Sequence, residues 1–402
     1  MNHYLILPFK YFFRDKTLSY DVILFSTLLV FLPAILITGR ALSDIFLTLI
    51  ACYFLFKSLI NKNWFYYKNP ITIGFILFSS YGIIRSLFIE TPLDSLTNEG
   101  SVFYFRYIFF AMGVWYLFDI NPHLPKCFVI VSILSLIIVC FDGLFQYFNG
   151  VNLFGVKYYS VDRLTGLFGD EPILGRYIAY LSIFTFALIY QNYEKSKKMM
   201  IFSISLLIMC EVMVFLSGER APFFTMSLFT ILVIIFIPHF RIYRIVGFLI
   251  SISLISLIIQ VNPIAKNRMV DYTINQVSQT KIPFLPYSPH HEEHYVSAIK
   301  MFLDNPLFGV GTNTFRYECD KEKYKYKERS CTSHPHNFYL QVLAELGTLG
   351  FLFIILLFFY LFYIVSKQFL SLVRFKKDKL IPFEIFLYPT ILIYLSKKQL
   401  IF

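Results

Sequence analysis

The sequence predicts an all-α, polytopic membrane protein with about 11–12 transmembrane helices, and three observations support this prediction. Hydrophobic residues make up 57% of the 402 residues and charged residues only 15%, whereas roughly 25% of an ordinary soluble chain is charged. The apolar residues are gathered into runs of about 20, enough for a helix to cross a hydrocarbon core of roughly 30 Å. Lys and Arg also recur at the turns that would lie on one side of the membrane.

Eleven segments are predicted to span the membrane. They lie near 20–38, 41–60, 70–89, 101–119, 125–148, 171–191, 199–217, 222–238, 243–262, 337–365 and 381–396. No stretch of the chain reads as a soluble domain or an internal repeat, so residues 1–402 are predicted to form a single membrane domain. The first 20 residues mix aromatic and basic side chains and do not have the pattern of a cleavable signal peptide.

The positions of the basic residues orient the chain, because Lys and Arg of membrane proteins gather in cytoplasmic loops. If the N-terminus lies inside, every cytoplasmic segment carries basic residues, and the 90–100 loop on the outside is acidic. Lys397 and Lys398 would lie outside and are the one pair that disagrees with this orientation. The residues that lie inside are Lys10, Arg14, Lys16, Lys57, Lys62, Lys68, Lys126, Lys195, Lys197, Lys198, Arg241, Arg244, Lys367, Arg374, Lys376, Lys377 and Lys379. The net charge of +11 therefore does not indicate nucleic-acid binding.

The longest polar segment, 263–336, falls outside between the ninth and tenth spans. It mixes ten Lys or Arg with eight Asp or Glu, so it is not a simple lipid-binding basic patch. Within it, residues 294–315 place apolar side chains at helical spacing before Asn-Pro and Gly-x-Gly stops, which predicts a short amphipathic helix on the membrane or over a cavity. Cys319 and Cys331 can form a disulfide in an oxidising compartment, and two free thiols are the alternative.

Two candidate anion-binding segments lie on the same outside face as this loop. The first, "DRLTGLFGDEPILGRY" (162–177), is too polar to cross the membrane, and the planar fork of Arg163 suits bidentate phosphate binding. The second is the short break "LSGERAPFF" (216–224), which holds Arg220. The alternatives are an Arg163 that reaches to the membrane interface and an Arg220 that pairs locally with Glu219.

The third candidate on this face is "SHPHNFYLQ" (333–341), where the polar loop meets the tenth span. A neutral histidine can accept a proton from a hydroxyl nucleophile at neutral pH, so His334 and His336 are both candidate bases. The alternative is a solvated helix start in which Asn337 caps the helix.

Metal and nucleotide sites find weaker support. "HHEEH" (290–294) matches a zinc-protease pattern through His290, Glu293 and His294, but it follows Pro289 and no third ligand is evident by spacing. No Asp-x-Asp occurs in the chain, and "GVGTN" (309–313) lacks the strand and helix of a nucleotide-binding unit. The sequence therefore predicts no metal and no cofactor.

Several of these segments together resemble a known family. "HPHNFYLQVLAELGTLGF" (334–351) closely resembles the hallmark of the O-antigen ligase and polymerase family of bacterial membrane glycosyltransferases. "RLTGLFGDEP" (163–172), "SGERA" (217–221) and "NPLFGVGTNTF" (305–315) look like its accompanying segments, in the expected order, so the resemblance covers roughly residues 20–365. It implies a GT-C-like membrane fold of about a dozen helices, with 263–336 as a large periplasmic loop.

The resemblance also implies a reaction, the metal-independent and inverting transfer of a glycan from undecaprenyl diphosphate to a sugar hydroxyl. His336 matches the loop histidine proposed as base, and Arg163 and Arg220 match diphosphate-binding arginines. Arginine forks suit a departing diphosphate in the absence of a metal, and a histidine suits deprotonation of the acceptor. Secondary candidates are His334, Asn337, Arg176, Arg316 and Glu345, the last as a residue that orients the tenth span.

The expected activity is O-antigen ligation to lipid A–core, at the periplasmic face of the bacterial inner membrane. The alternative within the family is an O-antigen polymerase that joins lipid-linked repeat units. A different class is a non-catalytic transporter of lipid-linked sugars, for which Arg85 and Arg106 inside the third and fourth spans are the best-suited residues. Expected partners are the lipid-linked donor, the acceptor and membrane lipids, but not nucleic acid. Family members usually continue through a further span or two after the point where this sequence stops.

Overall fold

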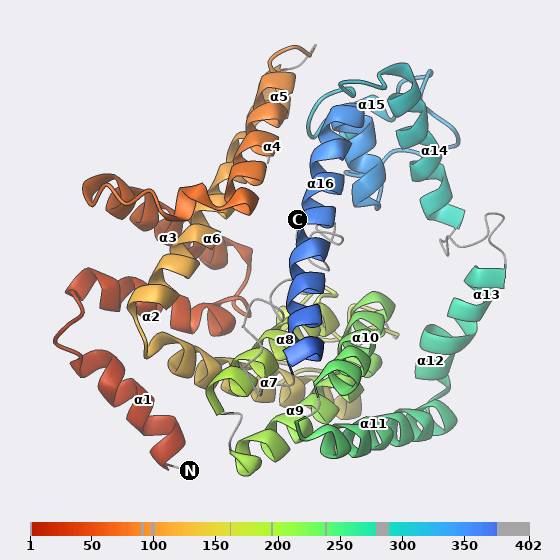
Figure 1. The fold of residues 1–402 in the computed structure, drawn as a ribbon. Coiled ribbons are helices and arrows are strands. Elements are labelled where there is room, and N and C mark those ends of the chain that lie inside the picture. Colours follow the sequence, from red (N-terminus) through yellow and green to blue (C-terminus); the bar gives the residue numbers. More distant parts are fainter. Residues whose placement is uncertain are drawn as a thin grey trace. The chain divides into compact units, whose positions relative to one another are not determined.

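A computed structural model describes residues 2–89, 92–97, 101–160, 162–193, 196–237, 239–278 and 289–375. Regular structure in these residues is helical (Figure 1). Extended backbone pairs there only as two isolated bridges, Val151–Lys157 and Ser160–Arg163. The predicted all-α class is therefore confirmed. The eleventh predicted span at 381–396, the discordant Lys397 and Lys398, and residues 279–288 of the long loop lie outside the described residues.

Five helices among the described residues are long and apolar enough to cross a membrane, which makes the chain a polytopic membrane protein. They cover Ala41–Ile60, Leu124–Asn149, Lys197–Leu216, Arg241–Val261 and Phe338–Ile364. Three shorter apolar helices, Tyr20–Ile35, Pro70–Ser86 and Arg220–Phe236, occupy further predicted spans. Two more helices, Phe105–Ile120 and Leu174–Tyr193, occupy the remaining two spans predicted within the described residues. Every predicted span among the described residues thus holds a helix, and five of these helices are long and apolar enough to cross a membrane.

The chain divides into two compact units. Of the described residues, the first unit holds those up to Phe46 together with Leu117–Asn275, and the second holds Leu47–Tyr116 together with those from Gln276 onward. The division falls within three helices, α3 (Arg40–Ile60), α6 (Phe105–Ile120) and α13 (Tyr272–Ser278). The prediction of a single membrane domain is not tested by this division and stays a prediction.

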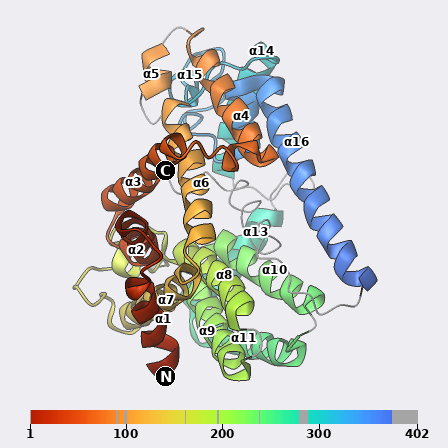
Figure 2. The ribbon, with the colours of Figure 1, turned by 60° about the vertical axis from the view of Figure 1, so that its left-hand side comes forward.

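The first unit is built around a bundle of long helices. α8 lies against α7, α9 and α10, and α9 lies against α11 (Figure 2). α8 buries side chains around its whole circumference, as expected of a central helix, and Leu174, Ile178 and Leu188 are fully buried. The helices of this unit are α1 (Asn2–Arg14), α2 (Tyr20–Ile35), α7 (Leu124–Asn149), α8 (Leu174–Tyr193), α9 (Lys197–Leu216), α10 (Arg220–Phe236), α11 (Arg241–Val261) and α12 (Pro263–Lys266), with the short turns η3 (Gly166–Phe168) and η4 (Asn267–Asp271).

The second unit joins a helical hairpin of the third and fourth predicted spans to the outside loop and the last described helix. In it, α16 lies beside both α4 and α14. Its helices are α4 (Pro70–Ser86), α5 (Pro92–Thr97), α14 (Pro289–Asp304), α15 (Phe315–Glu318) and α16 (Phe338–Phe375), with the short turns η1 (Tyr66–Lys68) and η2 (Ser101–Tyr104). The amphipathic helix predicted over 294–315 is α14, which begins five residues earlier and ends at Asp304, before the predicted Asn-Pro stop.

The segment after α14 exchanges hydrogen bonds with a kink in α16. The kink lies at Gly347, whose backbone is not helical (φ 65°, ψ −165°). In an unbroken helix the N–H of Thr348 would bond to the carbonyl of Ala344. Here it donates to the carbonyl of Pro306 (2.8 Å), and Ala344 instead accepts from the N–H of Val310 (2.9 Å). The backbone groups that the kink releases are therefore paired again by the loop.

The hydrogen bonds between this segment and α16 explain the glycine at position 309, in the Gly-x-Gly pattern (309–311). At Gly309, which has a positive φ of 69°, a Cβ atom would lie 2.3 Å from the carbonyl carbon of Glu345. Arg85 then holds the same segment: its guanidinium donates to the carbonyls of Phe308 (3.1 Å) and Gly309 (2.6 Å). Arg85 thus binds backbone carbonyls within its own unit, which weakens its assignment to a transport path.

Candidate active site

A polar loop after α7 positions Arg163. The side-chain oxygen of Gln146, buried at the end of α7, accepts the N–H groups of Thr165 (3.0 Å) and Gly166 (2.8 Å). Asn152, also buried, donates to the carbonyl of Gly166 (2.8 Å). These bonds replace the secondary structure that the loop lacks, so a segment too polar to cross the membrane is still held in a defined shape. The Arg163 guanidinium makes no hydrogen bond to another described residue.

Three arginines of the first unit, Arg163, Arg220 and Arg268, interact electrostatically and form what we call the arginine cluster. Arg268 lies on η4. Its Nε donates to the carbonyl of Gly218 (3.2 Å), and its Nη1 lies 3.4 Å from the Asp162 carboxylate. Burial and the charge of Arg163 lower the pKa of Arg268, an effect that Asp162 opposes. Asp162 and, toward Arg163, Glu219 supply opposing carboxylates, so the three cations keep an excess of positive charge that an anion can neutralise.

Tyr272 fixes two members of the arginine cluster. The guanidinium carbons of Arg220 and Arg268 lie 5.3 Å and 5.9 Å from the centre of its ring. Arg220 also donates to the hydroxyl of Thr273 (3.4 Å). An open pocket of about 660 Å³ borders the cluster; it is lined by Asp162, Pro263, Ile264, Asn267, Arg268 and Tyr272. The cluster therefore stands beside space for a ligand.

Arg268 was not predicted from the sequence. It lies seven residues after the end of α11, at the start of a long loop that mixes acidic and basic residues. Nothing in that pattern distinguishes it from its neighbours. Its contact with Gly218, 50 residues away, depends on the packing of η4 against the turn between α9 and α10. Only the fold brings the two segments together.

Glu219 and Arg176 form a buried pair beside this turn. Glu219 accepts the backbone N–H of Gly175 (2.7 Å), and its second oxygen lies 4.0 Å from Nη2 of Arg176. Burial raises the pKa of the Glu219 carboxyl to about 7, and the Arg176 charge opposes that rise. Glu219, the local partner considered for Arg220, is thus engaged with Arg176. The pair ties the start of α10 to the start of α8.

In the second unit, three histidines surround the predicted base His336, and the four residues together form what we call the histidine group. The ring centre of His336 lies 4.4 Å from that of His334, 5.1 Å from His291 and 5.4 Å from His294. His336 has a positive φ of 55°, an uncommon conformation for a residue other than glycine and one often found at functional sites. The next residue, Asn337, caps α16 by accepting the N–H groups of Tyr339 (3.0 Å) and Leu340 (3.2 Å).

His336 is neutral at physiological pH. Burial first, and then the charges of His334, His291 and His294 in that order, lower its pKa from 6.5 to about 4. Its ring nitrogens make no hydrogen bond to another described residue, so no carboxylate in this part of the chain orients the imidazole. A neutral imidazole has one nitrogen that can accept a proton.

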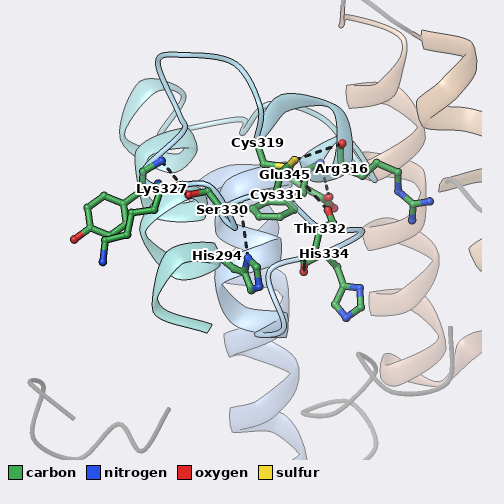
Figure 3. The surroundings of a disulfide bond; sticks show 11 residues. His294, Arg316, Cys319, Lys327, Ser330, Cys331, Thr332, His334 and Glu345 are labelled. Atoms are coloured by element: carbon green, nitrogen blue, oxygen red, sulfur yellow. Dashed lines mark hydrogen bonds between the residues drawn. A yellow bond between two sulfur atoms is a disulfide. The ribbon is translucent and has the colours of Figure 1, made fainter. Parts of the chain in front are cut away.

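A disulfide braces the loop that carries His334 and His336, and Figure 3 shows its surroundings. Cys319 and Cys331 are joined, with their Cα atoms 4.9 Å apart. Nearby, the buried carboxylate of Glu345 accepts the N–H of Phe315 (3.1 Å) and the side-chain amide of Gln341 (3.3 Å). Glu345 therefore links α16 to the start of α15, while the guanidinium of Arg316 points away from the disulfide in Figure 3.

The zinc-protease pattern is not supported by the described residues. His294 is buried, and its Nδ1 lies 3.3 Å from the carbonyl oxygen of Ser330. Glu293 accepts the N–H of Arg329 (3.1 Å). Among the residues that the structure describes, no group of three or more His, Cys, Asp or Glu has the geometry of a metal site. The arginine cluster belongs to the first unit and the histidine group to the second, and each is described within its own unit.

Fold and composition define this chain as a polytopic helical membrane protein, and comparison with known proteins finds a family match over part of it. Residues 204–355 match the family model described as O-antigen ligase, so the chain carries an O-antigen ligase family domain. The matched region includes Arg220, Arg268 and His336 but not Arg163. The predicted family resemblance is therefore confirmed.

The chain is also similar to a curated protein. Over 300 residues the chain is 29% identical to a protein of Rickettsia bellii (strain RML369-C) named "Putative polysaccharide ligase". The alignment covers 71% of this chain and 66% of the relative, so the chain matches just under two thirds of the relative's length.

Proposed function

We propose that this protein transfers a glycan from undecaprenyl diphosphate to a sugar hydroxyl of lipid A–core, at the periplasmic face of a bacterial inner membrane. The family domain supports a polysaccharide ligase in general terms. The single observation that carries the finer proposal is the arginine cluster, in which Arg163 has no hydrogen-bond partner among the described residues. Such a cluster suits a diphosphate better than a neutral sugar.

The arginine cluster would act on the leaving group. As the bond between the anomeric carbon and the phosphate oxygen breaks, negative charge develops on the diphosphate. Fixed guanidinium groups stabilise that charge without a metal, because they are already oriented when the bond breaks. Tyr272 and Asp162 supply this orientation for Arg220 and Arg268, while Arg163 stays available to the ligand.

His336 would act on the acceptor. The acceptor hydroxyl attacks the anomeric carbon from the face opposite the diphosphate and loses its proton to the imidazole, so the configuration at that carbon inverts. His336 is neutral at pH 7 and can accept this proton. A base of this kind typically contributes 10²- to 10⁴-fold to the rate. His334, whose ring lies beside that of His336, is the rival base.

The decisive experiment is a reconstituted transfer assay. Purified protein in liposomes receives lipid-linked glycan with either lipid A–core or a second lipid-linked repeat as acceptor, and products are separated by gel and mass spectrometry. We expect glycan on lipid A–core, and a loss of about 10²-fold or more in His336→Ala. The control is His239→Gln, a change at an exposed histidine of the first unit. Growth of the glycan on its carrier would instead indicate a polymerase, and activity of His336→Ala equal to wild type would exclude the base assignment.

A further inference from the structure

The histidines next to His336 come from two segments of the chain. His334 precedes it on the same loop, while His291 and His294 come from α14, more than forty residues earlier in the chain. The rings of His291 and His294 lie 6.4 Å apart, and each lies within 5.4 Å of the His336 ring. Two turns of one helix thus present imidazoles to a third imidazole on another segment.

Both α14 histidines are themselves held in place. His294 is 5% exposed, and its Nδ1 faces the carbonyl oxygen of Ser330, one residue before the disulfide cysteine Cys331. His291 stacks on the ring of Tyr295, with 21° between the planes. The disulfide and α14 therefore brace the surroundings of His336, whose own backbone is in the left-handed region.

The titratable groups near His336 in the described part of its unit have identified partners or act on His336 itself. The groups that act on it electrostatically are His334 on its own loop and His291 and His294 on α14. Glu293 on α14 turns to the N–H of Arg329, and Glu345 on α16 to Phe315 and Gln341. No described carboxylate therefore stabilises a charged His336, whereas three neighbours would repel it once they carry protons.

We propose that His291 and His294 are positioning residues for His336: their rings fix its imidazole and keep it in the neutral, proton-accepting form as the surroundings become acidic. The proposal rests on the proposed function for the identity of the reaction, but it concerns the state of His336 and can be tested without that reaction. A proton on a neighbouring ring opposes a proton on His336.

The first test reads the titration of His336 directly. Deuterium exchange at the imidazole Cε1 is followed from pH 4 to pH 9 in the wild type, His291→Gln and His291→Phe, and peptide fragments that separate His334 from His336 are analysed by mass spectrometry. We expect the pKa of His336 to rise above about 4 in both variants, although burial, the largest cause of the shift, remains. The Phe variant keeps a ring beside Tyr295 and removes only the titrating group, so it covers the case in which the Gln variant fails to fold.

The second test is the pH profile of glycan transfer. With a higher pKa on His336, the acidic limb of the profile moves to higher pH in His291→Gln. His239→Gln is the matched control and should leave the limb unchanged. A merely structural role would lower the rate at every pH and leave the midpoint in place.

The outcomes separate this inference from the proposed function. An unchanged His336 titration in both His291 variants would overturn the inference, even if transfer to lipid A–core were found. A shifted titration in a protein that transfers no glycan to either acceptor would keep the inference on the histidine group and reject the proposed function.

Discussion

Arginines of similar appearance in the sequence have different roles in the structure. Arg85 donates to the carbonyls of a loop, Arg176 pairs with the buried Glu219, and Arg268 joins the arginine cluster. Each role depends on the partner that the fold supplies, and those partners lie between about 40 and more than 220 residues away in the chain. The chemistry of an arginine is therefore set by what surrounds its guanidinium.

Arg268→Lys should weaken donor binding although it keeps the charge. A lysine offers no Nε–H to the carbonyl of Gly218 and no planar fork beside Asp162 and Tyr272. Charge-assisted hydrogen bonds are worth about 1.5–3 kcal/mol, so we expect KM for the lipid-linked donor to rise roughly 10- to 100-fold. The exposed Arg14→Lys is the control. A KM equal to wild type in Arg268→Lys would remove Arg268 from the binding site.

At the scale of elements, the contact between the segment after α14 and the kink in α16 shapes the second unit. Two positions there accept only glycine. A Cβ on Gly347, which has a φ of 65°, would lie 2.4 Å from the carbonyl oxygen of Leu307, and one on Gly309 would meet the backbone of Glu345. Since Glu345 and the histidine group lie on the elements joined here, this contact also places the candidate base.

Gly347→Ala should destabilise the protein. A non-glycine residue at this φ costs about 1–3 kcal/mol, and the added methyl group also displaces the backbone of Leu307. Thermal unfolding in detergent should show a clearly lower midpoint. Gly74→Ala, within α4 of the same unit, is the matched control because its Cβ meets no atom within 4 Å, and its midpoint should not fall. Equal midpoints for the two variants would contradict this account of the kink.

At the scale of the whole molecule, the distribution of basic residues predicts which loops face the cytoplasm. The helices occupy the predicted spans throughout the described residues, so the order of crossings can be tested one loop at a time. The segment with the disulfide, which needs an oxidising compartment, is predicted to lie outside. This sidedness is the basis for a periplasmic site.

Thiol labelling in whole cells should report the predicted sidedness. In a Cys52→Ser background, Lys325→Cys on the long loop should react with a membrane-impermeant maleimide. Lys16→Cys near the N-terminus should react only after permeabilisation. Both positions are exposed, and Cys52 is the exposed free cysteine among the described residues. Labelling of Lys16→Cys in intact cells would reverse the topology and contradict a periplasmic site.

The sequence by itself determined the all-helical membrane class, the places where helices form and the point after Asp304 where α14 stops. Apolar runs and helix-stop residues are local signals, and they act within a few residues of the structure they specify. The family resemblance of "HPHN" and its neighbours was visible for a similar reason, because a motif is contiguous. The segments around Arg163, Arg220 and His336 could therefore be singled out in advance.

Only the tertiary structure decided how these segments are completed. The arginine cluster gains Arg268 from a loop without a distinguishing pattern. His336 gains His291 and His294 from a stretch whose sequence is only a weak match to a zinc-protease pattern. The carbonyls that Arg85 binds and the hydrogen bonds exchanged at Gly347 likewise join residues far apart in the chain. Such partners depend on packing between helices, and packing arises from the shapes of whole surfaces rather than from a short pattern of residues.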